Sequence, residues 1–320
     1  MNRLIPFATL ASLLLTGTAM AAPNVVASTK PVHSLVAAVM AGVGEPALIV
    51  KGAASPHTYS LRPSDASALE SADIVFWTGH GMELFLADAL KTLSTKAETV
   101  ELAESPGIEL LPMREGGAFE PHSHGDEDHD HEGHGHDDHD GEHDHAHEHE
   151  EGDMHFWLDP ENAKLMVANI AQVLSKADPD NAATYNANAE TEIAALGALE
   201  TEIAATLAGV REKPFIVFHD AYQYFEKRFG LEVAGSITVS PEAMPGAARV
   251  DELRNKVSEL GATCVFAEPN FEPAIVKTIV EGSTAKAGVL DPEGSALAEG
   301  PGLYGDLLRG IAAGLVDCLG

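Results

Sequence analysis

The sequence has little positive charge and few cysteines, and it lacks a long apolar run beyond its first residues. It carries 19 Lys and Arg against 50 Asp and Glu in 320 residues, a formal charge of −31. A field this negative repels phosphate backbones and anionic lipid, which argues against a nucleic-acid or polybasic membrane-surface role. Cations are therefore the expected partners. With 45% apolar residues, the chain can still bury a sizeable core.

The first 21 residues have the pattern of a secretory signal peptide. Arg3 gives a positive start, residues 4–15 are mostly apolar, and Ala19-Met20-Ala21 places small residues at the cleavage site. The apolar run is shorter than the ~20 residues of a membrane-spanning helix, and no later run is long enough. We expect a soluble, exported mature chain that begins near Ala22.

Cys264 and Cys318 are the only cysteines, and both lie in the last third of the chain. An oxidising compartment favours their pairing. We predict one disulfide that closes a loop across the C-terminal region, with two buried free thiols as the alternative.

One segment, at about residues 115–153, differs from the rest in composition, and we call it the His-rich insertion. It contains 16 acidic residues and no Lys or Arg. Because it has no apolar periodicity, it cannot offset the entropy of ordering, so we predict a disordered insertion. Neutral imidazoles bind zinc, copper, nickel or iron, whereas a tract that only solubilises needs acids alone. The predicted low-affinity ligands are His122, His124, His129, His131, His134, His136, His139, His143, His145, His147 and His149.

Outside the insertion, short β-branched or aromatic runs alternate with helical patterns, which is typical of βα units around parallel sheets. Residues 181–208 contain no proline and favour one helix of ~25 residues, about 40 Å long. We predict an α/β fold of two βα lobes, at 22–178 and 211–320, joined by one long rigid helix at 179–210. Strands are expected at 25–28, 47–50, 74–77, 215–218, 237–239, 264–267 and 287–290, and helices near 31–41, 64–70, 82–93 and 160–176.

Four histidines occupy positions where open α/β sheets bind ligands, beyond the carboxyl ends of the strands. His57 and His80 follow the second and third predicted strands, and His219 follows the strand at 215–218. His155 lies where the insertion rejoins the fold. A simple turn is an equally good interpretation around His80. None of the spacings matches a zinc finger or a His-Glu-x-x-His helix, so spacing alone does not define a metal site.

Asp220, next to His219, is expected either to cap the helix that follows or to orient the imidazole as a hydrogen-bond acceptor.

A series of motifs runs through the whole mature chain. They are Lys30-Pro31-Val32, His57-Thr58-Tyr59-Ser60-Leu61-Arg62-Pro63-Ser64-Asp65, the His-rich insertion, His155-Phe156-Trp157-Leu158-Asp159-Pro160, Phe218-His219-Asp220-Ala221-Tyr222-Gln223-Tyr224-Phe225, Pro241-Glu242 and Thr263-Cys264-Val265-Phe266-Ala267-Glu268-Pro269. In this order they resemble the ZnuA family, the periplasmic zinc-binding proteins of bacterial high-affinity zinc ABC transporters.

The resemblance implies two lobes bridged by a long helix, with one metal ion in the cleft between them. It makes His57, His155 and His219 the zinc ligands, and it pairs Cys264 with Cys318. It further implies a periplasmic protein that captures Zn²⁺, passes it to a membrane permease and performs no catalysis. We expect a monomer.

The sequence departs from the family in one place, because Pro56 stands where some members carry a possible fourth ligand, a glutamate. Water, a histidine of the insertion or Asp291 could fill that position, since manganese- and iron-binding relatives use an aspartate in a similar region. Three imidazoles suit Zn²⁺ better than the oxygen-rich sets that select manganese.

Two alternative functions stay open at this stage. A zinc-dependent hydrolase would use the same three histidines with Glu268 or Asp291 as base, although no motif supplies a base and a substrate pocket. A periplasmic metal buffer without a permease would share the site.

Overall fold

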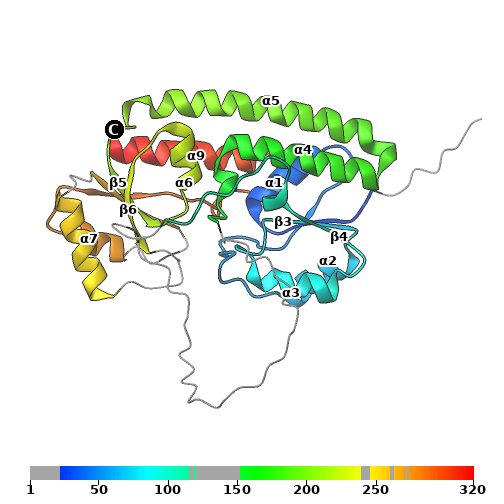
Figure 1. Cartoon of the computed structure of the whole chain (residues 1–320), viewed down its shortest axis with the longest axis horizontal. Helices are drawn as coiled ribbons and strands as arrows, with labels where there is room; N and C mark the ends of the chain where they lie inside the picture. Colours follow the sequence, from blue (N-terminus) through cyan, green and yellow to red (C-terminus); the bar gives the residue numbers. More distant parts are fainter. Residues whose placement is uncertain are drawn as a thin grey trace, which may run out of the picture.

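The computed structural model describes residues 22–114, 119, 152–238, 246–259, 263–269, 271 and 274–320. The predicted signal peptide, the eleven histidines of the insertion and Pro241-Glu242 lie outside the described residues. Two α/β lobes lie side by side, and long helices run along one side of both (Figure 1). Within the described part of the chain, no helix is long and apolar enough to cross a membrane.

The N-terminal lobe is built on a four-stranded parallel sheet with the strand order β2-β1-β3-β4. Its strands are β1 (Val25–Ala27), β2 (Ala47–Leu48), β3 (Ile74–Trp77) and β4 (Glu98–Glu101), and its helices are α1 (Lys30–Val39), α2 (Pro63–Ser71) and α3 (Leu84–Leu93). The three predicted strands and three predicted helices are confirmed, within the usual uncertainty at element ends. Strand β4 was not predicted, because its sequence is polar and it lies at the exposed edge of the sheet.

The C-terminal lobe repeats this architecture with the parallel order β6-β5-β7-β8. Its elements are β5 (Phe215–His219), α6 (Gln223–Phe229), β6 (Val233–Thr238), α7 (Ala247–Glu259), β7 (Cys264–Ala267), α8 (Ala274–Val280), β8 (Lys286–Val289) and α9 (Leu303–Leu319). All four predicted strands are found, although the run at 237–239 is only the end of β6. A disulfide joins Cys264 in β7 to Cys318 in α9, as predicted.

Two long helices, α4 (Pro160–Ala177) and α5 (Ala182–Thr206), follow the insertion. Asp159 caps α4, since its side chain accepts a hydrogen bond from the Glu161 N–H at 2.9 Å. Helix α5 lies across α4 of the N-terminal lobe and α9 of the C-terminal lobe (Figure 1). Its buried side chains recur every three to seven residues and form one stripe: Tyr185, Ala189, Leu196, Leu199 and Ile203. The long helix of the prediction is thus present and packs against both lobes.

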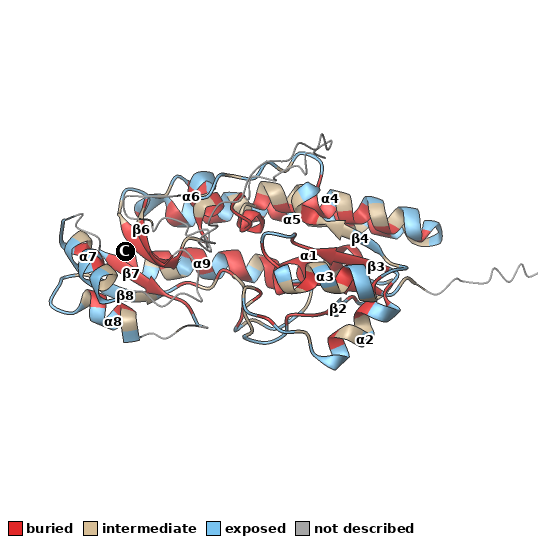
Figure 2. Cartoon of the chain, turned by 60° about the horizontal axis from the view of Figure 1, so that its bottom comes forward, coloured by how far each residue is buried: buried red, intermediate tan, exposed pale blue. Residues whose placement is uncertain are grey.

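A second connection holds the lobes together. The buried Lys30 ammonium in α1 donates to the backbone carbonyls of Gly294, Ser295 and Leu297, at 3.2, 2.8 and 3.1 Å. Nearby, the Tyr304 hydroxyl donates to the Trp157 carbonyl at 2.6 Å. One hydrophobic core runs from the N-terminal sheet through α5 to α9, and buried positions line the inner faces of the helices (Figure 2). The junction is therefore packed and hydrogen-bonded; the domain limits proposed from sequence stay a prediction.

Candidate metal centre

Three histidines from distant parts of the sequence meet at the junction of the lobes. His57 lies in the loop after β2, His155 precedes a short 3-10 turn at Phe156–Leu158, and His219 is the last residue of β5. One ring nitrogen of each lies within 4.8 Å of the others. The Nε2 atoms of His155 and His219 are 3.2 Å apart, and the His57 ring centroid is 5.6 Å from each of the other two. Nitrogens this close can share a single ion.

The cluster is shielded from water. The exposed fractions are 7% for His155 and 3% for His219, and the Nε2 of His57 is buried with no hydrogen-bond partner among the described residues. A buried polar atom left unpaired costs about 1–3 kcal/mol. A cation bound to the three nitrogens would remove that cost, so the donor set fits a metal ion.

Two buried carboxylates orient the rings. Asp153 Oδ1 lies 2.8 Å from His155 Nδ1, and Glu268 Oε1 lies 2.6 Å from His219 Nδ1. A carboxylate can only accept, so each Nδ1 donates and each Nε2 keeps its lone pair directed at the cluster. Carboxylates of this kind fix the tautomer and raise the basicity of metal-binding histidines.

Asp220 neither caps the following helix nor orients the His219 ring, so both expected roles are wrong. Its carboxylate is held by the Arg114 guanidinium, with Nε donating at 2.9 Å, and helix α6 starts three residues later with Tyr222 at its N-cap. Glu268 orients His219 instead. Glu268 directly follows β7, the strand next to β5. Because adjacent parallel strands end at the same sheet edge, the sequence held a usable signal for Glu268.

The electrostatic environment differs among the three rings. Burial, assisted by His155 and His219, lowers the pKa of His57 well below its ordinary value, which keeps this ring neutral and its lone pair free. At His219, burial also acts to lower the pKa, but the Glu268 carboxylate outweighs it and the pKa is raised. An ion that binds at His219 must therefore compete with a proton that Glu268 favours.

The remaining candidate residues lie elsewhere. Asp291 accepts hydrogen bonds from Ser295 Oγ at 2.9 Å and from the Glu293 N–H at 3.2 Å, within its own loop. Among the described residues, the histidine trio is the single group whose ligand atoms converge for a metal. His80 lies outside this group, paired with Glu101 on the surface.

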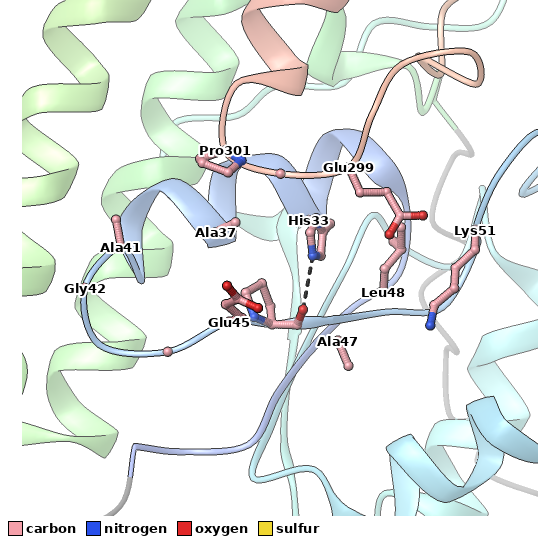
Figure 3. A pocket seen from close by; sticks show the side chains of 13 residues that line it. His33, Ala37, Ala41, Gly42, Glu45, Ala47, Leu48, Lys51, Glu299 and Pro301 are labelled. Carbon is pink, nitrogen blue, oxygen red and sulfur yellow. Dashed lines mark hydrogen bonds between the residues drawn. The ribbon is translucent and has the colours of Figure 1, made fainter.

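A separate cavity of about 520 Å³ lies between the N-terminal lobe and the segment Glu299–Pro301 (Figure 3). Its one histidine, His33, bonds through Nε2 to the Pro46 carbonyl at 3.1 Å. No second histidine lines this cavity, and it holds none of the candidate ligands.

Two parallel-sheet α/β lobes, a long helix across both, and a small buried set of ligand atoms between them define a solute-binding protein.

Comparison with known proteins identifies which kind. The family model of the periplasmic component A of the zinc-uptake complex, ZnuA, matches residues 25–318. The high-affinity zinc uptake system protein ZnuA of Brucella abortus is 56% identical over 305 residues, covering 92% of this chain and 91% of the relative. The ZnuA protein of Paracoccus denitrificans is 43% identical over 300 residues, covering 93% and 92%.

Solved structures agree with this fold. A crystal structure of ZnuA superposes with a TM-score of 0.74 at 23% identity and covers 93% of this chain and 100% of that one. The laminin-binding adhesin Lmb of Streptococcus agalactiae superposes with a TM-score of 0.73 at 26% identity, with the same coverage. The chain belongs to the ZnuA family of periplasmic zinc-uptake binding proteins. It is thus a binding protein and not a hydrolase.

Proposed function

We propose that this chain captures one Zn²⁺ in the periplasm at His57, His155 and His219 and delivers it to an ABC-transporter permease for import. The observation that carries the proposal is the meeting of three imidazole nitrogens within 4.8 Å at the lobe junction. Imidazole is a preferred ligand of Zn²⁺, which forms bonds of ~2.0–2.1 Å to nitrogen in a tetrahedral set. A monomer is sufficient, because one chain supplies all three ligands.

The three ligands have different tasks in capture. His57 is neutral at periplasmic pH and offers Nε2 at no proton cost, since its pKa is lowered by burial. His155 and His219 present Nε2 because Asp153 and Glu268 hold their other nitrogens. Asp291 accepts hydrogen bonds within its own loop, and its oxygens are not among the described ligand atoms that converge on the trio. Water or an insertion histidine is the simpler fourth ligand.

We propose that the His-rich insertion serves as an auxiliary, low-affinity collector or sensor of zinc. Its eleven histidines and 16 acids raise the local cation concentration. The described residue Gly152, at its C-terminal end, lies three positions before His155.

Calorimetric zinc titration tests the proposal on three forms of the mature protein. These are the parent chain, a chain with residues 120–151 replaced by a short Gly-Ser linker, and the triple variant His57→Ala/His155→Ala/His219→Ala. The deletion ends at Glu151 so that Asp153 remains to orient His155. We expect one tight site that survives the deletion and disappears in the triple variant, and a lower stoichiometry without the insertion.

If tight binding is lost when the insertion is deleted and persists in the triple variant, the protein is instead a histidine-rich buffer. Zinc uptake by cells that lack the protein tests the permease step, because a buffer is not needed for transport at limiting zinc. Normal uptake in such cells would refute delivery.

A further inference from the structure

His80 repeats, on the surface, the arrangement of the two oriented histidines of the trio. Its Nδ1 lies 3.0 Å from Glu101 Oε2, and its backbone N–H donates to Glu101 Oε1 at 3.0 Å. Since the carboxylate can only accept, the neutral ring carries its proton on Nδ1 and has its lone pair on Nε2. The His80 side chain is 60% exposed. Of the five described histidines, His80 thus combines a carboxylate partner with direct access to solvent.

The loop that carries His80 is held by hydrogen bonds to a buried side chain. The buried Glu83 carboxylate accepts from the backbone N–H groups of Thr78 and Gly79, at 3.2 and 2.9 Å, and from the Ser28 hydroxyl at 2.5 Å. The His80 ring packs edge-on against Trp77, with ring centroids 4.7 Å apart. A histidine exposed only for solubility does not require these bonds. His80 is held in a defined position.

That position adjoins the segment that carries one ligand of the trio. The Cβ of any larger residue at Gly81 would lie 2.7 Å from Met154 Cγ, and at Gly79 it would lie 2.8 Å from Met154 Cε. The two glycines therefore let the His80 loop pack directly on Met154, the neighbour of His155. An ion at His80 would lie beside the chain segment that carries His155.

We propose that His80, oriented by Glu101, is a low-affinity docking position for Zn²⁺ from which the ion passes to the histidine trio. This inference rests on the proposed function. One imidazole and water ligands hold the ion weakly, so it exchanges quickly. Because a docking position lies on the path in both directions, its loss slows association and dissociation together and leaves the Kd of the tight site unchanged.

Stopped-flow fluorescence of the mature protein tests the proposal. The chain has two tryptophans, and the Trp157 ring lies 5.2 Å from His155. Trp157 therefore reports on the trio, and Trp77 is kept in every variant because its ring packs against His80. We compare His80→Asn with Asp88→Asn, which removes one charge from an exposed carboxylate of the same lobe. Each is measured in the full mature chain and in the chain lacking residues 120–151.

We expect His80→Asn to slow zinc association about tenfold, the lower end of what focusing of a charged ligand achieves, with an unchanged Kd. Glu101→Gln should have an intermediate effect, and Asp88→Asn none. An unchanged rate in His80→Asn would overturn the inference, as would a weaker Kd with an unchanged association rate. Loss of the tight site in the parent chain would refute the proposed function instead.

Nuclear magnetic resonance of histidine-labelled protein gives a direct readout in the chain lacking residues 120–151. The first equivalent of Zn²⁺ should shift the ring-nitrogen resonances of the histidine trio. Further zinc should then shift the Nε2 resonance of His80 in fast exchange, and Glu101→Gln should weaken this second step. A His80 resonance that does not move at a large excess of zinc would contradict the proposal.

Discussion

Replacing Glu268 tests whether the orientation of one ring sets the zinc affinity. The Glu268 carboxylate lies 2.6 Å from His219 Nδ1, and both side chains are buried. In Glu268→Ala the Nδ1 proton loses its acceptor, and the ring is free to carry its proton on Nε2, the nitrogen that the ion requires. Loss of such an orienting carboxylate lowers metal affinity about 10- to 100-fold, or about 1.4 to 2.8 kcal/mol.

The pH dependence of binding supplies a second readout for the same residue. Glu268 raises the pKa of His219 in spite of burial, so zinc must displace a proton from His219 at pH values above the ordinary pKa near 6.5. Affinity therefore falls as pH decreases through this range. In Glu268→Gln the amide oxygen still accepts from Nδ1, but the largest charge that opposes burial is gone, so the pKa of His219 falls relative to the parent. The affinity of that variant should depend less on pH.

The assay is competition for zinc against a chelating dye at several pH values from about 6 to about 8.5, the range around the ordinary histidine pKa. Glu259→Gln, an exposed carboxylate of the same lobe, serves as the control. We expect a large loss of affinity in Glu268→Ala, and a smaller loss with a shallower pH profile in Glu268→Gln. A folded Glu268→Ala variant with parental affinity and parental pH profile would refute the reasoning.

Three further predictions concern stability. Cys264→Ser/Cys318→Ser should lower the free energy of unfolding by about 4 kcal/mol, because the disulfide closes a loop of 54 residues. Urea titration measures this free energy, and a loss near zero would contradict the prediction. Lys30→Met should cost about 2–3 kcal/mol, since three buried carbonyls lose a charged donor; an unchanged thermal midpoint would show that they find other partners. Burial lowers the pKa of His33 in the folded protein. As pH falls below about 6.5, the unfolded chain therefore binds a proton before the folded chain does. The free energy of unfolding then drops by up to about 1.4 kcal/mol per pH unit. His33→Gln, which keeps a donor for Pro46, should lose less stability between about pH 7.5 and pH 5.5; an equal loss in both proteins would contradict this.

The sequence predicted the strands better than it predicted the site. Runs such as Ile74–Trp77 are buried on both faces of a parallel sheet, so they read as continuous apolar segments. Strand β4 has the polar sequence Glu-Thr-Val-Glu at Glu98–Glu101, and an edge strand need not be apolar. The long helix was predictable because its composition is uniform and lacks proline.

The three histidines could not be grouped from their spacing, since they are 98 and 64 residues apart in sequence and meet only through the tertiary fold. Resemblance to a family supplied the grouping. The orienting carboxylates were missed for the same reason: Glu268 lies 49 residues from His219 and is brought to it by the pairing of β5 with β7. Asp153 was locally visible, two residues before His155, but the acidic composition of the insertion concealed it.

The packed junction also bears on how zinc would leave. The trio draws its ligands from both lobes, and removal of the ion would again leave Nε2 of His57 buried without a partner. Moving the lobes apart to admit water would break the three bonds of Lys30 and the bond from Tyr304 to Trp157. Removing the ion and moving the lobes apart each cost free energy. Release at the permease of the proposed function would therefore require a compensating interaction. A proton on His219 is one such interaction, because Glu268 already favours the charged ring and a protonated imidazole cannot bind the ion.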